Sequence, residues 1–339
     1  VQPADAARLR LGLRCRDHWN EEEMGDQVKP TQLAASLILT TLSFAPAAAQ
    51  DAAPGQAAAE EQSSHAIGAD LLISTDADNT DVIRAGLNLD PWYKGQQGYL
   101  GLRLEKVWYR PLGGKTLSKE RAYLRYADQS GGWAWNTQVG TDGDTVLGSA
   151  SIHDDAKFRK EFFIERDMIE TTRGVREGIY YTFVGAAIDL PADERNNFTL
   201  MAGAQEFTGK NVRLHARFNY VHVLKPELGL SAQLRTRYFH STEPGEYDYY
   251  SPRWYLQVLP LLQMRRYSGG WRYMIAGGVG AQRDAVSDWR ASYYGAAEVT
   301  SPEIGRDWFL KAGVQYNNIP QNTGAYDYFQ GTVSLTRRF

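Results

Sequence analysis

The chain has 339 residues, of which 43% are hydrophobic and 12% aromatic, and its formal net charge is −3. Its 37 basic and 40 acidic side chains nearly balance, so we expect no binding to a nucleic acid backbone. One cysteine, Cys15, excludes a disulfide framework and a thiolate zinc site. The body of the chain has no run of about 18 apolar residues, which excludes a helical membrane protein but not a membrane β-barrel.

The first segment has the layout of a secretory signal. Met24 is followed by Lys29, an apolar stretch over residues 33–44 and the alanines 47–49, which form an A-x-A cleavage site. A short buried helix is the alternative, but the Ala/Gln/Glu-rich tract that follows gives such a helix nothing to pack on. We therefore predict upstream translation over residues 1–23, a signal peptide over 24–49, a flexible periplasmic leader over 50–65 and one barrel domain over 66–339.

From residue 67 onward the chain alternates apolar and polar residues in segments that Gly, Pro, Asn and Asp separate. In residues 211–222 the apolar face holds Val212, Leu214, Ala216, Phe218 and Tyr220, and the other face holds Asn211, Arg213, His215, Arg217 and Asn219. The predicted strands cover residues 67–74, 82–89, 99–109, 119–126, 133–140, 144–150, 157–166, 178–189, 197–207, 210–222, 227–240, 252–266, 270–282, 287–300, 305–318 and 325–339. The even number suits a single-chain bacterial barrel.

Three features favour a membrane barrel over a soluble sandwich, which also alternates. The segments are long for a soluble sheet, aromatic residues gather at their ends, and the chain ends on Phe339 in an amphipathic segment. A terminal aromatic resembles the assembly signal of bacterial outer-membrane barrels. The predicted fold class is all-β, a transmembrane antiparallel β-barrel of about 16 strands in the cell outer membrane, with membrane lipid and the barrel-assembly machinery as partners. Its interior exceeds what side chains fill, so a channel follows unless loops plug it.

One stretch resembles a known family. Tyr249, Tyr250, Ser251 and Pro252 precede a long strand that contains Tyr255 and Pro260, and this pattern resembles the barrels of exopolysaccharide exporters, the poly-N-acetylglucosamine export porin and the cellulose exporter. The resemblance implies a sixteen-stranded pore that passes a polysaccharide chain. Those exporters carry helical repeats that this chain lacks, so a periplasmic helical-repeat scaffold would be another chain or be absent. A strand-initiation motif without substrate contact is the alternative, and Pro260, facing lipid, should mark a bulge or bend.

The inward face of the last seven strands is strongly basic. Tyr294 and Tyr328 are candidate stacking platforms for sugar rings, and Glu298 is the one clear acid. The basic residues on the predicted substrate path are Arg213, Arg217, Arg235, Arg237, Arg253, Arg265, Arg272, Arg290, Lys311 and Arg338. Either they pair across the lumen with acids of the first half, such as Glu105, Glu161 and Glu165, or they remain unpaired and attract an anionic solute.

Three functions remain open. The preferred one is an outer-membrane pore for an exopolysaccharide, anionic if the arginines are unpaired. A passive anion-preferring diffusion porin or receptor barrel is the alternative and needs a loop folded inward, with candidates at residues 110–118, 167–177 and 241–251. An outer-membrane enzyme would draw on His153, Asp154 and Asp155, with His215 or His240 as base and Ser231 or Ser292 as nucleophile, but no catalytic motif surrounds them. We predict no cofactor and no metal site.

Overall fold

The structure is a computed structural model that describes residues 64–77, 80–110, 114–303, 306–321 and 324–339. All of these belong to one compact unit, Leu33–Phe339. The predicted upstream segment, the signal peptide and the leader up to residue 63 lie outside the described residues. Within the described ranges no helix is long and apolar enough to cross a membrane.

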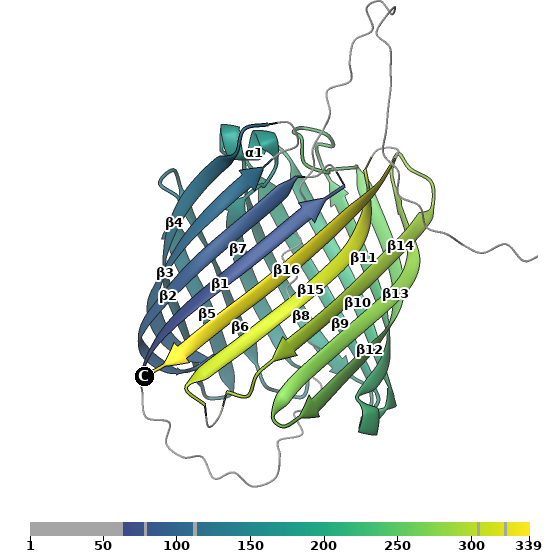
Figure 1. Cartoon of the computed structure of the whole chain (residues 1–339). Coiled ribbons are helices and arrows are strands. Elements are labelled where there is room, and N and C mark those ends of the chain that lie inside the picture. Colours follow the sequence, from purple (N-terminus) through teal and green to yellow (C-terminus); the bar gives the residue numbers. More distant parts are fainter. Residues whose placement is uncertain (1–63, 78–79, 111–113, 304–305, 322–323) are drawn as a thin grey trace, which may run out of the picture. The chain divides into compact units, whose positions relative to one another are not determined.

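In the described part of the chain, sixteen strands form a closed antiparallel barrel, as predicted (Figure 1). Each strand pairs with the next, and β1 closes the barrel against β16 from Ala66 with Arg338 to Asp76 with Tyr328. Closure leaves no free strand edge, which is what a sheet in lipid requires. The strands are β1 Ser64–Asp76, β2 Asp81–Gly95, β3 Gly98–Arg110, β4 Leu117–Ser130, β5 Trp133–Thr141, β6 Val146–Asp154, β7 Lys160–Met168, β8 Tyr180–Pro191, β9 Asn196–Phe207, β10 Val212–Lys225, β11 Leu230–Ser241, β12 Trp254–Ser268, β13 Trp271–Asp284, β14 Arg290–Thr300, β15 Trp308–Gln321 and β16 Gly324–Arg338; the helices are α1 Thr172–Glu177 and η1 Pro226–Leu228.

Alternation along each strand sets the two faces of the wall. On β3, Leu100, Leu102 and Leu104 are 47%, 50% and 51% exposed, while the next residue, Glu105, points to the other face and is buried. Exposing these leucines to water would cost free energy, whereas contact with lipid makes their outward position favourable. The polar residues of the other face then line the lumen. The chain is therefore an outer-membrane barrel, with the polar face inward as the alternation predicts.

Two lysines, Lys106 and Lys160, lie on the outer face of the wall. Lys106 is 2.8 Å from Glu120, its cross-strand neighbour on β4, and Lys160 is 3.0 Å from Asp154. Lys106 lies close to the end of β3, and Lys160 is the first residue of β7. Each positive charge on the outside thus has an acidic partner near the membrane interface, where a charge is less costly than at the midplane.

The two ends of the barrel differ in the length of their connections. At the end that holds Phe339, β2 joins β3 through residues 96–97 and β4 joins β5 through Gly131 and Gly132. The φ angles of Gly131 and Gly132 are 60° and 79°, which suit a type I′ hairpin turn. The opposite end carries residues 169–179 and 242–253. Short turns mark the periplasmic end of outer-membrane barrels, so the longer connections are extracellular.

The bulge predicted at Pro260 is not present in strand pair β12–β13. Val258 pairs with Ala281 and Leu261 with Gly278, so the register is the same on both sides of the proline. The ring of Pro260 points outward and is exposed, as predicted. Proline removes one ladder donor here, and the long antiparallel pairing on either side holds the register.

Candidate functional site

A chain of ion pairs covers the lumen wall formed by β1–β4 and β7. Asp70 lies 2.5 Å from Arg103, which lies 2.7 Å from Glu105. Glu105 also bonds Arg121 at 3.1 Å, and Arg121 reaches Asp167 at 3.1 Å. We call these five residues the paired wall. Each acid in it has an arginine from the same half of the barrel, so this half adds little net field to the lumen.

The same pattern extends to the extracellular and periplasmic ends. Arg84 bonds Asp167 at 3.1 Å and Glu170 at 2.7 Å, and Arg159 bonds Glu161 at 2.9 Å. Glu170 lies beyond the end of β7; burial and the charge of Asp167 raise its pKa, and Arg84 opposes them in part. Glu105 and Glu161 thus have arginine partners in their own half of the barrel, and among the described residues these two acids form no ion pair with the arginines of β10–β12.

The opposite wall carries guanidinium groups of another kind. Arg217 on β10 and Arg237 on β11 are direct cross-strand partners. Arg235 lies on β11 two residues before Arg237, and Arg265 lies on β12. We call these four residues the arginine face. None of them lies within ion-pair distance of a carboxylate of the described residues, and the Nε atoms of Arg217 and Arg237 are buried without a hydrogen-bond partner there. Like charges opposite each other destabilise a sheet, so this face suits an anionic ligand.

The arginine face borders a lumen cavity of about 600 Å³. Arg272 and Lys311 also line it, and both bond Glu298, at 2.7 Å and 3.4 Å. The carboxylate of Glu298 therefore forms ion pairs with two cations, and the lining of the cavity has a net positive charge. Arg235 lies 5.1 Å from the ring centroid of Tyr294, so a guanidinium and an aromatic face meet at the cavity wall.

Arg213 differs from the four arginines although it shares their face. It is 3% exposed and donates to the backbone oxygen of Tyr250 at 2.5 Å. Its guanidinium lies 4.4 Å from the ring centroid of Phe239 and 5.0 Å from that of Phe207. Arg213 therefore holds the extracellular loop against the wall and does not line the cavity.

The remaining predicted path residues lie nearer the ends of the barrel. Arg253 precedes β12 and is exposed, outside the strand in which the sequence placed it. Arg290 begins β14, and Arg338 ends β16 with its guanidinium donating to the backbone oxygen of Arg306 at 3.3 Å. Tyr328 donates to Gln330 at 3.0 Å on the inner face of β16. These four are apart from the cavity that Tyr294 lines.

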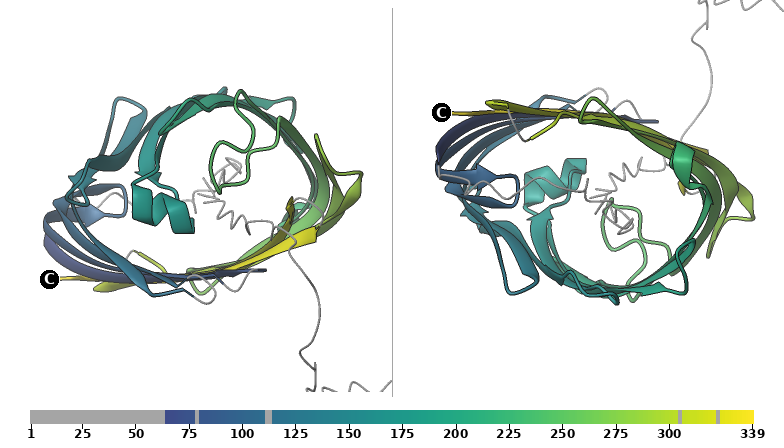
Figure 2. Two further views of the ribbon diagram at one scale, coloured as in Figure 1. Left: turned by 90° about the horizontal axis from the view of Figure 1, so that it is seen from above. Right: turned by 90° about the horizontal axis from the view of Figure 1, so that it is seen from below.

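The family-like motif lies in the connection 242–253, which bends over the lumen in both axial views (Figure 2). The ring of Tyr249 stacks on Phe207 with centroids 4.4 Å apart, and Tyr250 Oη donates to Asp284 at 2.6 Å. Ser251 Oγ accepts from the backbone of Gly245 at 2.9 Å. Burial raises the pKa of Tyr249 to about 12. The prediction that β12 opens at Pro252 is wrong: the strand begins at Trp254, and the motif shapes an inward loop.

Helix α1 meets this loop above the lumen (Figure 2). Thr171 Oγ1 donates to Asp248 at 2.6 Å, and the backbone N–H of Arg173 donates to the other carboxylate oxygen at 2.8 Å. The guanidinium of Arg173 lies 4.9 Å from the ring of Tyr247. Two of the three candidate loops therefore fold inward and join. Asp248 was not among the predicted site residues, because a single acid between turn residues carries no periodic signal.

A buried apolar cluster of the barrel wall packs against the loop 242–253 through Tyr249. It lies on β7–β9 and on the connection between β7 and β8, and it includes Tyr249 of the loop. Its members are Phe163, Ile169, Ile179, Tyr181, Phe183, Ala187, Met201, Phe207 and Tyr249. Because apolar burial is non-directional and strong, this cluster fixes the loop to one side of the lumen, while the arginine face lies further along the wall.

The candidate catalytic groups do not assemble. Asp154 faces outward and bonds Lys160, and His215 Nε2 lies 3.1 Å from Gln205. Ser292 Oγ accepts from Gln257, and Ser231 Oγ donates to the backbone of Gln263. No histidine of the described chain meets both a serine and an acid. Within the same ranges, no group of three or more His, Cys, Asp or Glu is placed to hold a metal ion.

Comparison with known proteins finds no matching family model and no matching curated protein. A solved structure described as a bacterial polysaccharide outer membrane secretin matches with a TM-score of 0.59 and 13% identity, over 80% of this chain and 98% of that one. OccK5 (OpdH) of Pseudomonas aeruginosa gives a TM-score of 0.41 and 11% identity over 82% and 99%. The predicted likeness to a polysaccharide-exporting barrel is confirmed for the fold.

Proposed function

We propose that the chain is an outer-membrane pore that passes an anionic exopolysaccharide along the arginine face. The observation that carries this proposal is the set of four guanidinium groups without a carboxylate partner in the described chain, beside a cavity of about 600 Å³. A guanidinium fork binds carboxylate or sulfate through two parallel hydrogen bonds. A polymer that carries such groups would supply the counter-charge that the wall lacks.

The spacing of the arginines suits a repeating ligand. Arg235 and Arg237 are two residues apart on β11, which is roughly 7 Å along a strand, and Arg217 and Arg265 lie on the flanking strands β10 and β12. An acidic sugar unit that leaves one guanidinium is then close to the next guanidinium. This favours movement of the polymer along the wall over tight binding at one place. The fold shared with a polysaccharide secretin supports the same direction. We include in this proposal a helical-repeat scaffold in the periplasm as a partner of the pore.

A passive anion-preferring porin is the second candidate. The inward loop 242–253, joined to α1 through Asp248, favours it because such a constriction selects small solutes by size. The two functions differ in the solute: a polymer exporter engages several sugar units at once, whereas a diffusion porin handles single small anions.

Current block in planar bilayers tests the proposal. The full chain is reconstituted, and galacturonate oligomers of one, four and eight units are compared with neutral malto-oligosaccharides of equal length. We expect block that strengthens with the length of the acidic oligomer and little block by the neutral series. Equal block by both series contradicts the anionic polymer. Equal block by the monomer and the octamer favours the passive porin.

A variant pair assigns the block to the arginine face. Arg235→Gln with Arg237→Gln removes two charges from the cavity, and Arg283→Gln removes one from the outer face, where Arg283 lies 5.9 Å from the Trp254 ring. Only the first variant should weaken the block by the octamer. An equal effect of Arg283→Gln contradicts the site.

A further inference from the structure

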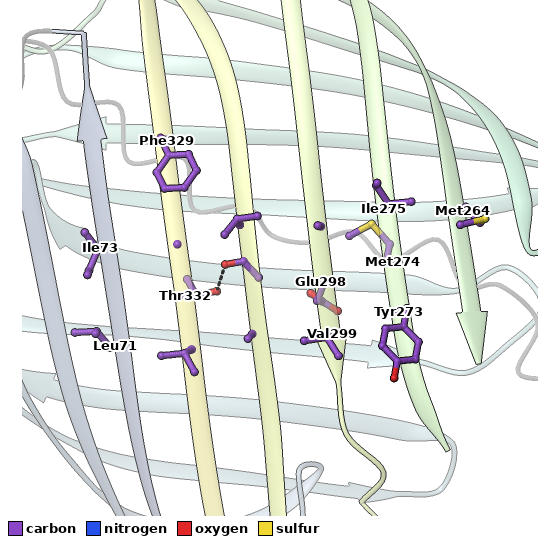
Figure 3. A pocket seen from close by; sticks show the side chains of 16 residues that line it. Leu71, Ile73, Met264, Tyr273, Met274, Ile275, Glu298, Val299, Phe329 and Thr332 are labelled. Carbon is purple, nitrogen blue, oxygen red and sulfur yellow. Dashed lines mark hydrogen bonds between the residues drawn. The ribbon is translucent and has the colours of Figure 1, made fainter. Parts of the chain in front are cut away.

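A groove of about 690 Å³ crosses the outer face of the barrel over β12–β16 and β1 (Figure 3). It is almost entirely apolar. Tyr273, Ile275 and Met264 form one side, and Leu71, Ile73 and Phe329 form the other. These side chains point toward lipid, so the groove lies on the opposite side of the wall from the arginine face.

Small residues make the floor of the groove. Ala297 pairs with Val314 and Gly331 pairs with the same valine from the other side, while Ala312 lies one outward position further along β15. A Cβ on Gly331 would meet nothing within 4 Å. Glycine weakens a strand, and no packing within the wall requires it here. The space therefore suits a molecule outside the barrel.

Unpaired cations and aromatic rings lie at the periplasmic end of the same face. Trp308 pairs with Arg337, and the Arg306 guanidinium lies 5.1 Å from the Trp308 ring and 6.0 Å from the Trp271 ring. In the described chain neither arginine has a carboxylate within ion-pair distance. Trp308 precedes Ala312 by four residues, which is roughly 14 Å along a strand and within the reach of one acyl chain.

We propose that this face binds an anionic phospholipid of the periplasmic leaflet. One acyl chain occupies the groove, and Arg306 and Arg337 hold the phosphate among the interfacial tryptophans, where such headgroups lie. A second copy of the chain fits less well. An isologous contact about this groove would bring the same arginines face to face and would oppose one hollow with another.

Native mass spectrometry of the full chain tests the site. The barrel is extracted into detergent with equal amounts of phosphatidylglycerol and phosphatidylcholine, and the lipid retained per monomer is counted. We expect one phosphatidylglycerol retained in preference. Arg306→Gln with Arg337→Gln should weaken its retention about thirtyfold, since each arginine near an anionic lipid contributes about fivefold.

Gly331→Leu fills the groove without touching the arginines and should also abolish the retention. Ala202→Leu places the same side chain on the outer face of β9, and Arg283→Gln removes an arginine from the extracellular end, so both should leave retention unchanged. Equal retention of the two lipids, or equal loss in the control variants, overturns the proposal. A dimer that Gly331→Leu converts to a monomer also overturns it, and assigns the groove to a second copy.

Discussion

Removing the charge of the arginine face should reduce the anion preference of the pore while the barrel stays folded. The variant changes Arg217, Arg235, Arg237 and Arg265 to Gln. Arg213 is left intact because it bonds the backbone of Tyr250 and stacks between aromatic rings, so its loss would also release the loop. Glutamine keeps most of the side-chain volume and can still donate hydrogen bonds into the lumen.

The magnitude follows from Coulomb's law. One unit charge shifts the free energy of an anion about 10 Å away by roughly 0.4 kcal/mol in water, so four charges amount to about 1.7 kcal/mol, a factor of about fifteen. Screening over about 10 Å at 0.1 M salt lowers this factor to about three. The same charges repel potassium equally, so the chloride-to-potassium permeability ratio changes by the square of this factor. We expect that ratio to fall about ninefold at 0.1 M salt by these estimates, and the difference to vanish at 1 M salt, where the screening length is about 3 Å.

Reversal potentials across a planar bilayer with a salt gradient measure the ratio, and heat-modifiable migration on a gel measures folding. Thermal stability should hold or rise, because unpaired charges are removed from a partly buried wall. Arg283→Gln on the outer face should change neither quantity. An unaltered ratio in the quadruple variant would refute the reasoning. Cation selectivity of the unmodified pore would do the same and would favour a cationic polymer such as partly deacetylated poly-N-acetylglucosamine.

Three further changes address other parts of the chain. Asp248→Ala removes both hydrogen bonds between α1 and the loop, so single-channel conductance should rise and flicker more often. Burial alone would raise the pKa of Asp142, but the hydrogen bonds from Tyr180 and from two backbone N–H groups outweigh it and lower the pKa. The stability that Asp142 lends to the β5–β6 loop should therefore be complete above its ordinary value of 3.8 and be lost as pH falls through the lower folded pKa, seen as faster amide exchange in residues 143–145 after correction for intrinsic rates. Deleting Phe339 should lower the yield of assembled barrel far more than Phe329→Ala, since Phe339 directly follows the closing strand β16, is exposed and bonds the backbone of His65.

Each of these has a clear contrary result. Conductance unchanged by Asp248→Ala would mean that the two loops stay joined without the carboxylate. If the corrected exchange rates do not rise as the pH falls, or if they rise equally in Asp142→Asn, Asp142 does not stabilise this loop. Equal heat-modifiable yield for the two phenylalanine variants would place no assembly signal at the C-terminus.

The strand number and the two faces of the wall were predictable because a β-strand repeats every two residues. Arg217 and Phe218 therefore fall on opposite faces in any register that keeps the wall amphipathic. The loop that carries Tyr249 was not predictable. Its position depends on stacking of Tyr249 on Phe207 and on the hydrogen bonds that Asp248 accepts from Thr171 and Arg173, which are all far away in sequence.

Which of the inward arginines form ion pairs could also not be predicted from the sequence. Arg84 meets Asp167, 83 residues away, only because the lumen brings β2 and the end of β7 together. Alternation says that both side chains face inward but not which acid each arginine reaches. Arg213 illustrates the same limit: its inward position was predicted, whereas its burial under the loop depends on Tyr250.

The division of the lumen into a paired wall and an arginine face has a consequence for sequence divergence among descendants of this chain. Breaking one buried ion pair costs about 3–5 kcal/mol, so Asp70, Arg103 and Glu105 can change only together. Arg217 and Arg235 form no ion pair in the described chain, so replacing either one alone leaves no carboxylate unpaired. The preferred solute can therefore drift through single substitutions on one side, while the other side preserves the barrel.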